Sequence, residues 1–218
     1  MGNNILDNDL EQLKSEILKM SALVEKAIYV SMESLMEDKV DTAQQVIQDD
    51  DNIDTLYQDV QKKCMRLLAL RHPLAVDLRT VQAEMQIATD LERMGDRAEK
   101  IAKSTLQLHG KRTIADLSSM SLLTAAVMEM LSIIVNSYAK ADVESARNIV
   151  ILEDKIDGLY KNYFNSLMEI IEGDGAKAYM AVQLLFAIYC LERIADHATN
   201  IGESVIYMAT GERVRLND

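Results

Sequence analysis

The chain contains little proline, glycine, cysteine or tryptophan for its length of 218 residues. It has one Pro, eight Gly, two Cys and no Trp. Sheets and their turns need more chain-breaking residues than this, so the composition favours long uninterrupted helices and an all-α fold. With 49% hydrophobic and 27% charged residues, the chain lies in the ordinary globular range. That range excludes a disordered tail, a collagen-like fibre and a disulfide-stapled small protein.

Basic residues are also scarce, which argues against a nucleic acid partner. The chain has 23 Lys and Arg against 35 Asp and Glu, a net charge of -12, so its surface repels nucleic acids and acidic lipid headgroups. Apolar stretches at 122–135 and 180–191 are interrupted or shorter than the roughly 20 residues that span a bilayer. We therefore expect a cytoplasmic protein without membrane insertion, in which Cys64 and Cys190 are reduced core thiols.

A helical period of 3.6 residues runs along nearly the whole chain and is interrupted at five points. The six helices that it predicts span residues 9–37, 40–71, 73–109, 113–139, 142–172 and 175–209. Pro73 is suited to the first turn of a helix, and Thr113 with Asp116 resembles a capping box at a helix start. Gly110 and Gly211 are typical of helix ends.

The two halves of the chain repeat each other. Leu-Glu-Arg-Met-Gly-Asp at 91–96 recurs as Leu-Glu-Arg-Ile-Ala-Asp at 191–196, and the pattern of residues 46–57 recurs at 149–160. The repeating unit has three helices. Residues 1–110 and 111–218 are therefore expected to form two pseudo-symmetric three-helix bundles.

Carboxylates spaced i, i+4 interrupt an apolar helix face in both copies of the repeat. The eight residues are Asp50, Asp54, Glu92, Asp96, Glu153, Asp157, Glu192 and Asp196, with Glu99 and Glu203 as secondary candidates one turn further on. Like charges one turn apart repel mildly, and burying an unpaired carboxylate costs several kcal/mol. Each half therefore needs a cation beside its carboxylates.

That cation is either a metal ion or a basic side chain. If the second and third helices of each half pack together, four carboxylates converge in each half. Oxygen ligands of this kind favour Mg²⁺, Mn²⁺, Ca²⁺ or iron, and Zn²⁺ is less natural. The alternative is a purely structural bundle with ion pairs to arginine. Its candidates are Arg66, Arg71, Arg79, Arg93 and Arg193.

No set of residues typical of catalysis accompanies these carboxylates. The sequence lacks a Gly-rich phosphate loop, a nucleophile elbow and a Ser/His/Asp set, and we expect His72, His109 and His197 to be structural or solvated rather than ligands. We therefore expect a protein that is not an enzyme. The rival hypothesis is a metal-dependent enzyme with its carboxylate site in a helical bundle.

Three further motifs occur in a fixed order along the repeat. They are His-Pro-Leu-Ala-Val-Asp-Leu-Arg at 72–79, the duplicated Glu-Arg-hydrophobic-x-Asp at 92–96 and 192–196, and Asp-His-Ala-Thr-Asn-Ile at 196–201. In combination with the duplication, they resemble the PhoU family of phosphate-transport regulators. The resemblance covers essentially the whole chain.

The resemblance implies a cytoplasmic regulator that acts on a phosphate ABC transporter, through its ATPase subunit, and on a sensor histidine kinase. It would hold the kinase inactive when phosphate is plentiful. A homodimer and multinuclear metal clusters, iron among them, on the Glu/Asp-x-x-x-Asp motifs are also implied. One departure from the family pattern is Lys100, where the second copy has Asn200. This cation could weaken metal binding in the first half.

Overall fold

The computed structural model describes residues 2–114 and 116–216, and most of them are helical. The helices in these ranges are α1 (Gly2–Glu37), α2 (Val40–Arg71), α3 (Val76–Leu108), α4 (Ser118–Lys140), α5 (Val143–Asn148), α6 (Val150–Gly173) and α7 (Gly175–Thr210). Ile149 alone separates α5 from α6, and its backbone stays right-handed helical (φ -60°, ψ -25°). The two together fill the expected helix at 142–172, so the all-α fold of six long helices is confirmed.

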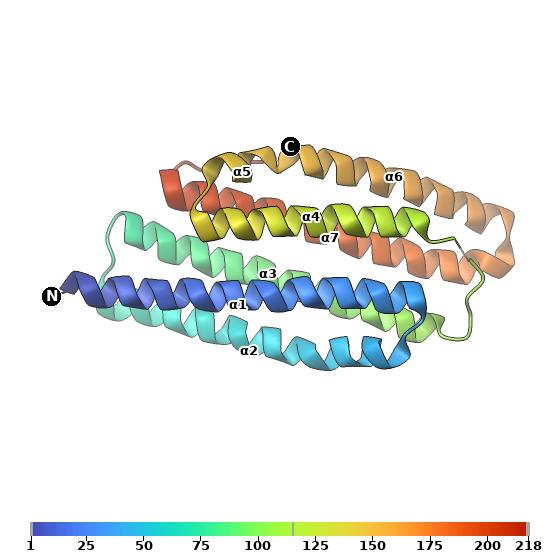
Figure 1. Ribbon diagram of the computed structural model, residues 1–218, viewed down its shortest axis with the longest axis horizontal. Helices are drawn as coiled ribbons and strands as arrows, with labels where there is room; N and C mark the ends of the chain where they lie inside the picture. The colour runs from blue at the N-terminus through green and yellow to red at the C-terminus, as the bar shows by residue number, and fades with distance from the viewer. Residues whose placement is uncertain (1, 115, 217–218) are drawn as a thin grey trace.

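The helices form two three-helix units that pack against each other lengthwise. In Figure 1, α1, α2 and α3 lie together, and α4, α6 and α7 lie together with α5 at one end. The pair α3 and α7 shares the most extensive contact in the described chain. Buried side chains of both units form one continuous core around that pair. The expected domain boundary at residue 110 falls in the connection between α3 and α4 and stays a prediction.

Two helices of the first unit begin at other residues than expected. α1 begins at Gly2 rather than at residue 9. α3 begins at Val76. We expected Pro73 in the first turn of this helix, but it lies in the connection before it. His72 ends α2 in the left-handed conformation (φ 47°), and Ala75 also has a positive φ of 48°. A residue that precedes proline avoids the right-handed helical region, which places the break there.

The connection between the two units also differs from the expected capping box. α4 begins at Ser118, and the Oδ1 of Asp116 accepts a hydrogen bond from the Ser118 backbone N–H at 2.9 Å. The start predicted at Thr113 was therefore wrong, because Asp116 caps a local turn instead. The two predicted helix ends are confirmed. Gly110 (φ 72°) follows His109, the C-cap residue of α3, and Gly211 (φ 81°) ends α7, both glycines in the left-handed conformation.

Two helices are long and apolar enough to cross a membrane by length and hydropathy. α4 and α7 contain 18-residue windows with mean hydropathies of 1.7 and 1.4. Our expectation that no apolar stretch is long enough was therefore wrong on that measure. About half of each window is buried inside the protein. A core helix of a folded bundle shows the same pattern, and Val127 and Ile188 are fully buried in it.

Both cysteines are free and buried, as expected for core thiols. Burial raises the pKa of the Cys64 thiol to about 12 and that of Cys190 to about 11. The thiols are therefore protonated and poorly nucleophilic at neutral pH.

Candidate functional site

The carboxylates predicted in the first half lie together where α2 packs on α3. Burial, and after it the neighbouring charges of Asp54, Glu99, Asp96 and Glu92, raise the pKa of Asp50 to about 6. Burial and the charge of Asp96 also raise the pKa values of Asp54 and Glu92. The structure therefore brings the four predicted residues and Glu99 into one electrostatically coupled group, which we call the first cluster.

The second half builds an equivalent group where α6 packs on α7. Burial raises the pKa of Glu153, and so do the charges of Asp157, Asp196 and Glu192. Burial and the charges of Asp196 and Asp157 likewise raise the pKa of Glu192. These four residues form the second cluster. All eight sequence-predicted carboxylates thus belong to one of two clusters related by the internal repeat.

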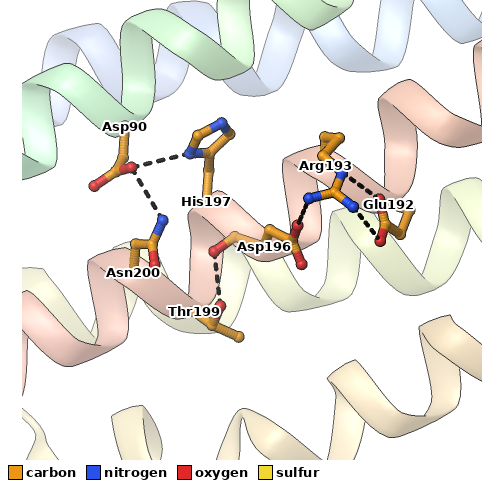
Figure 2. Close-up of polar contacts among 7 residues, drawn as sticks. All are labelled: Asp90, Glu192, Arg193, Asp196, His197, Thr199 and Asn200. Atoms are coloured by element: carbon orange, nitrogen blue, oxygen red, sulfur yellow. Dashed lines mark hydrogen bonds and ion pairs between the residues drawn. The ribbon is translucent and has the colours of Figure 1, made fainter. Parts of the chain in front are cut away.

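Basic side chains compensate the two clusters differently. In the second cluster, Arg193 lies between two carboxylates: its Nε is 2.9 Å from Glu192 Oε2, and its Nη1 is 2.8 Å from Asp196 Oδ2 (Figure 2). In the first cluster, Lys100 Nζ lies 3.3 Å from Asp96 Oδ2. The corresponding Arg93 forms no ion pair within the described ranges. The predicted arginine pairing therefore occurs in the second half only.

The other arginines that the sequence offered as ion-pair partners do not compensate the clusters. Arg71 pairs with Asp9 on α1, with its Nε 2.9 Å from the carboxylate Oδ2. Within residues 2–114 and 116–216, neither Arg66 nor Arg79 forms an ion pair with a carboxylate of either cluster. The first cluster thus keeps an excess of negative charge.

The donor chemistry of both clusters suits a hard divalent cation, although the side chains are not arranged around a point. Among the residues that the structure describes, no three Asp, Glu, His or Cys side chains lie close enough together to hold one ion. Glu192 Oε2 is buried and accepts no hydrogen bond, since Arg193 Nε faces it without hydrogen-bond geometry. Terminal carboxylate torsions have broad minima, so these oxygens can be reoriented by rotation of the side chains.

A glycine lets α3 approach the first cluster closely. A Cβ on Gly95 would lie 3.2 Å from Asp50 Oδ1 and 3.2 Å from Ile53 Cδ1. In the second half, Ala195 occupies the corresponding position, and the longer Glu153 replaces Asp50. The second half therefore has the larger residue on both sides of this contact.

We expect Gly95→Ala to give no gain in stability, although alanine is the better helix former. Gly158, in α6, has no atom within 4 Å of an added Cβ, so Gly158→Ala should raise the free energy of unfolding by about 0.5–1 kcal/mol. At Gly95 the contact with Asp50 and Ile53 offsets that gain. Urea unfolding of both variants checks the difference. An equal gain in both would show that the contact with Asp50 carries no cost.

Sequence reasoning missed a buried carboxylate between the two clusters. Asp90 on α3 is fully buried, and its Oδ1 accepts hydrogen bonds from His197 Nδ1 at 2.9 Å and from Asn200 Nδ2 at 3.3 Å (Figure 2). His197 thus makes a structural hydrogen bond to Asp90, as expected. The sequence did contain a signal, because Asp90 departs from the internal repeat. The second copy has the apolar Cys190 at the corresponding core position.

Comparisons with known proteins agree with the fold and the repeat. The PhoU domain family matches residues 17–105 and 120–205. The chain is 37% identical to a phosphate-specific transport system accessory protein PhoU homolog of Clostridium acetobutylicum, over all of both chains. It is 36% identical to the protein of the same description in Aquifex aeolicus, over 96% of this chain and 95% of that one.

Solved structures show the same fold. The crystal structure of PhoU from Pseudomonas aeruginosa matches with a TM-score of 0.91 and 30% identity, over 94% of this chain and 99% of that one. The phosphate transport system regulatory protein PhoU from Streptococcus pneumoniae matches with a TM-score of 0.88 and 28% identity, over 96% and 99%. On its duplicated motifs, its helical fold and its similarity over essentially the full length, the chain belongs to the PhoU family.

Proposed function

We propose that this chain is a cytoplasmic, non-enzymatic regulator of phosphate uptake and of the phosphate-starvation response. It acts as an adaptor between the ATPase subunit of a phosphate ABC transporter and a sensor histidine kinase, as a homodimer. The observation that supports the proposal most is similarity over the full length to proteins described as accessory to phosphate-specific transport. The acidic, fully helical surface suits docking onto basic helical partners, with association rates that depend on salt.

We further propose that each cluster holds divalent metal, with iron, Mn²⁺ or Mg²⁺ favoured and Zn²⁺ possible. Burial and mutual repulsion raise the pKa values of Asp50, Glu92, Glu153 and Glu192, which is the mark of carboxylates that lack enough positive charge. Bound metal would supply that charge and tie α2 to α3 and α6 to α7. In the second cluster, metal has to displace Arg193 from Glu192 and Asp196.

Deletion of the gene from its own host tests the regulatory role. We expect a phosphate-starvation reporter to become active in phosphate-rich medium, and a plasmid copy of the intact gene to silence it again. The signal should pass through the histidine kinase, so a second deletion of the kinase should restore silence. A reporter that stays silent after the first deletion would refute the regulatory role.

Elemental analysis of untagged protein tests the metal sites. We expect stoichiometric metal in the parent protein and none in a variant in which Asp50, Glu92, Glu153 and Glu192 are all replaced by alanine. Asp51→Ala/Asp154→Ala is the matched control, since both side chains are exposed neighbours of the clusters. This control should keep its metal. Chelation should lower the melting temperature of the parent and of this control but not that of the fourfold variant, because metal binding contributes directly to folding stability.

Protein that contains no metal and takes none up from Mg²⁺, Mn²⁺, Fe²⁺ or Zn²⁺ would contradict the metal proposal. The regulatory role would then still depend on the reporter experiment, because an adaptor needs only its docking surfaces.

A further inference from the structure

A polar groove lies on the seam between α3 and α7, between the two carboxylate clusters. Its volume is about 480 Å³, and its lining includes one carboxylate of each cluster, Asp96 and Asp196. The donors that face it are Arg93 and Arg97 of α3, with Arg193, His197 and Asn200 of α7. Arg93 and Arg193 occupy corresponding positions of the internal repeat, as do Arg97 and His197. The groove therefore follows the pseudo-twofold relation between the units.

Three arginines share this groove in a protein with a net charge of -12. Two guanidinium groups lie against the same ring, since Cζ of Arg97 is 5.7 Å and Cζ of Arg193 is 5.3 Å from the centroid of Tyr189. Like charges gathered in one groove repel, unless an anion lies between or beside them. The arrangement therefore favours a bound anion.

Among the described residues, the carboxylates of the groove supply a counter-charge to Arg193 but to neither of the other two arginines. Asp196 is paired with Arg193, and Asp96 with Lys100. Within residues 2–114 and 116–216, Arg93 and Arg97 form no ion pair. Their guanidinium groups are thus available to a ligand.

The buried Asp90 holds two of the other donors in place. His197 is only 12% exposed, and its Nδ1 donates to Asp90 Oδ1, which leaves the other ring nitrogen directed away from Asp90 (Figure 2). Asn200 donates to the same carboxylate oxygen. Side chains fixed before a ligand arrives lose little conformational entropy on binding.

We propose that this groove binds a phosphate group, which Arg93, Arg97 and Arg193 contact directly and which His197 and Asn200 help to position. Planar guanidinium groups match the oxygens of phosphate, and several of them together give charge-assisted hydrogen bonds. The volume exceeds that of one phosphate ion, so the group is either free phosphate or the end of a small organic phosphate. The inference deepens the proposed function, on which its biological meaning rests: the regulator binds the ligand to which it responds.

Isothermal titration calorimetry of the intact chain tests the groove. The protein is first treated with a chelator, and the probes are inorganic phosphate and, separately, ATP. We expect saturable binding of one phosphate per chain, and a loss of about tenfold or more in affinity in Arg93→Gln/Arg97→Gln. Arg213→Gln/Arg215→Gln removes the same charge from another groove of the surface. This control should keep its affinity within about twofold, and circular dichroism verifies that both variants are folded.

The outcomes separate the possible ligands and the two proposals. Tighter binding of ATP than of phosphate, with the same dependence on Arg93 and Arg97, would assign the groove to a small organic phosphate. The proposal is overturned if neither probe binds, if both double variants lose affinity equally, or if phosphate binds only with added metal and regardless of Arg93 and Arg97. Because the titration uses purified protein, it can succeed even if the reporter experiment refutes the regulatory role.

Discussion

Replacing Asp90 by alanine is expected to lower the free energy of unfolding by about 3 kcal/mol. The carboxylate is fully buried, accepts from His197 and Asn200 of α7, and also accepts from Gln86 Nε2 at 3.1 Å. Its removal leaves the partly buried His197 and Asn200 without this acceptor in the α3–α7 contact, and each unsatisfied buried donor costs about 1–3 kcal/mol. The exposed Gln86 can donate to water instead. The hydrogen bonds of Asp90 across the interface between α3 and α7 therefore help to hold the two units in one arrangement.

Urea unfolding of Asp90→Ala, Asp90→Asn and Asp59→Ala measures this effect. Asparagine keeps one acceptor oxygen, so Asp90→Asn should lose about half as much stability as Asp90→Ala. Asp59 pairs with Lys62 on the exposed surface of α2, at a distance of 3.4 Å. Its replacement should change stability by less than about 0.5 kcal/mol. A loss as small in Asp90→Ala as in Asp59→Ala would mean that the network contributes nothing.

Replacing Glu84 by glutamine is expected to stabilise the protein at pH 8 by about 2 kcal/mol. Glu84 is 2% exposed, its Oε1 accepts from the Tyr138 hydroxyl at 2.8 Å, and its Oε2 has no hydrogen-bond partner among the described residues. Burial raises the pKa of Glu84 from 4.5 to about 7, against the smaller opposing influence of the Tyr138 hydrogen bond and Lys14. At pH 8 the side chain is therefore a buried anion with one partner, whereas glutamine is neutral.

The same pKa shift determines how stability depends on pH. The folded protein holds the Glu84 proton more tightly than the unfolded chain, so the contribution of this group is complete below about pH 4.5. It is lost as the pH rises through about 7, and a difference of this size corresponds to roughly 3 kcal/mol at most. Glutamine does not titrate, so the variant should lose less stability than the parent between pH 5 and pH 8.

Urea unfolding of the parent, Glu84→Gln and Glu144→Gln at pH 5 and pH 8 checks this prediction. Glu144 is exposed in α5, so its replacement should leave the pH dependence of the parent unchanged. The carboxylates of the two clusters add a slope of the same sign, which all three proteins share. If the parent and Glu84→Gln show parallel changes between the two pH values, the carboxyl group of Glu84 ionises normally.

The clusters illustrate what could be predicted before the tertiary structure was known. Asp50 with Asp54, and Glu92 with Asp96, are one turn apart, so helical spacing alone places each pair on one face. The repeat then indicates that the second half builds the same arrangement. The ion pair of Arg193 could not be predicted in this way, because Arg93 has the same local sequence and yet forms no ion pair with the residues that the structure describes.

Local periodicity and the duplication were therefore enough to determine the all-α class, the number of long helices and the two carboxylate clusters, since each depends on residues within a few turns of one another. The helix starts at Val76 and Ser118, the contact of Asp90 with His197 and the burial of Glu84 against Tyr138 were decided by tertiary structure. Asp90 and His197 are 107 positions apart in the chain, and Glu84 and Tyr138 are 54 apart. Only the packing of α3 against α7 and of α3 near α4 determines which of these side chains meet, because helical spacing contains no information about the neighbouring helix.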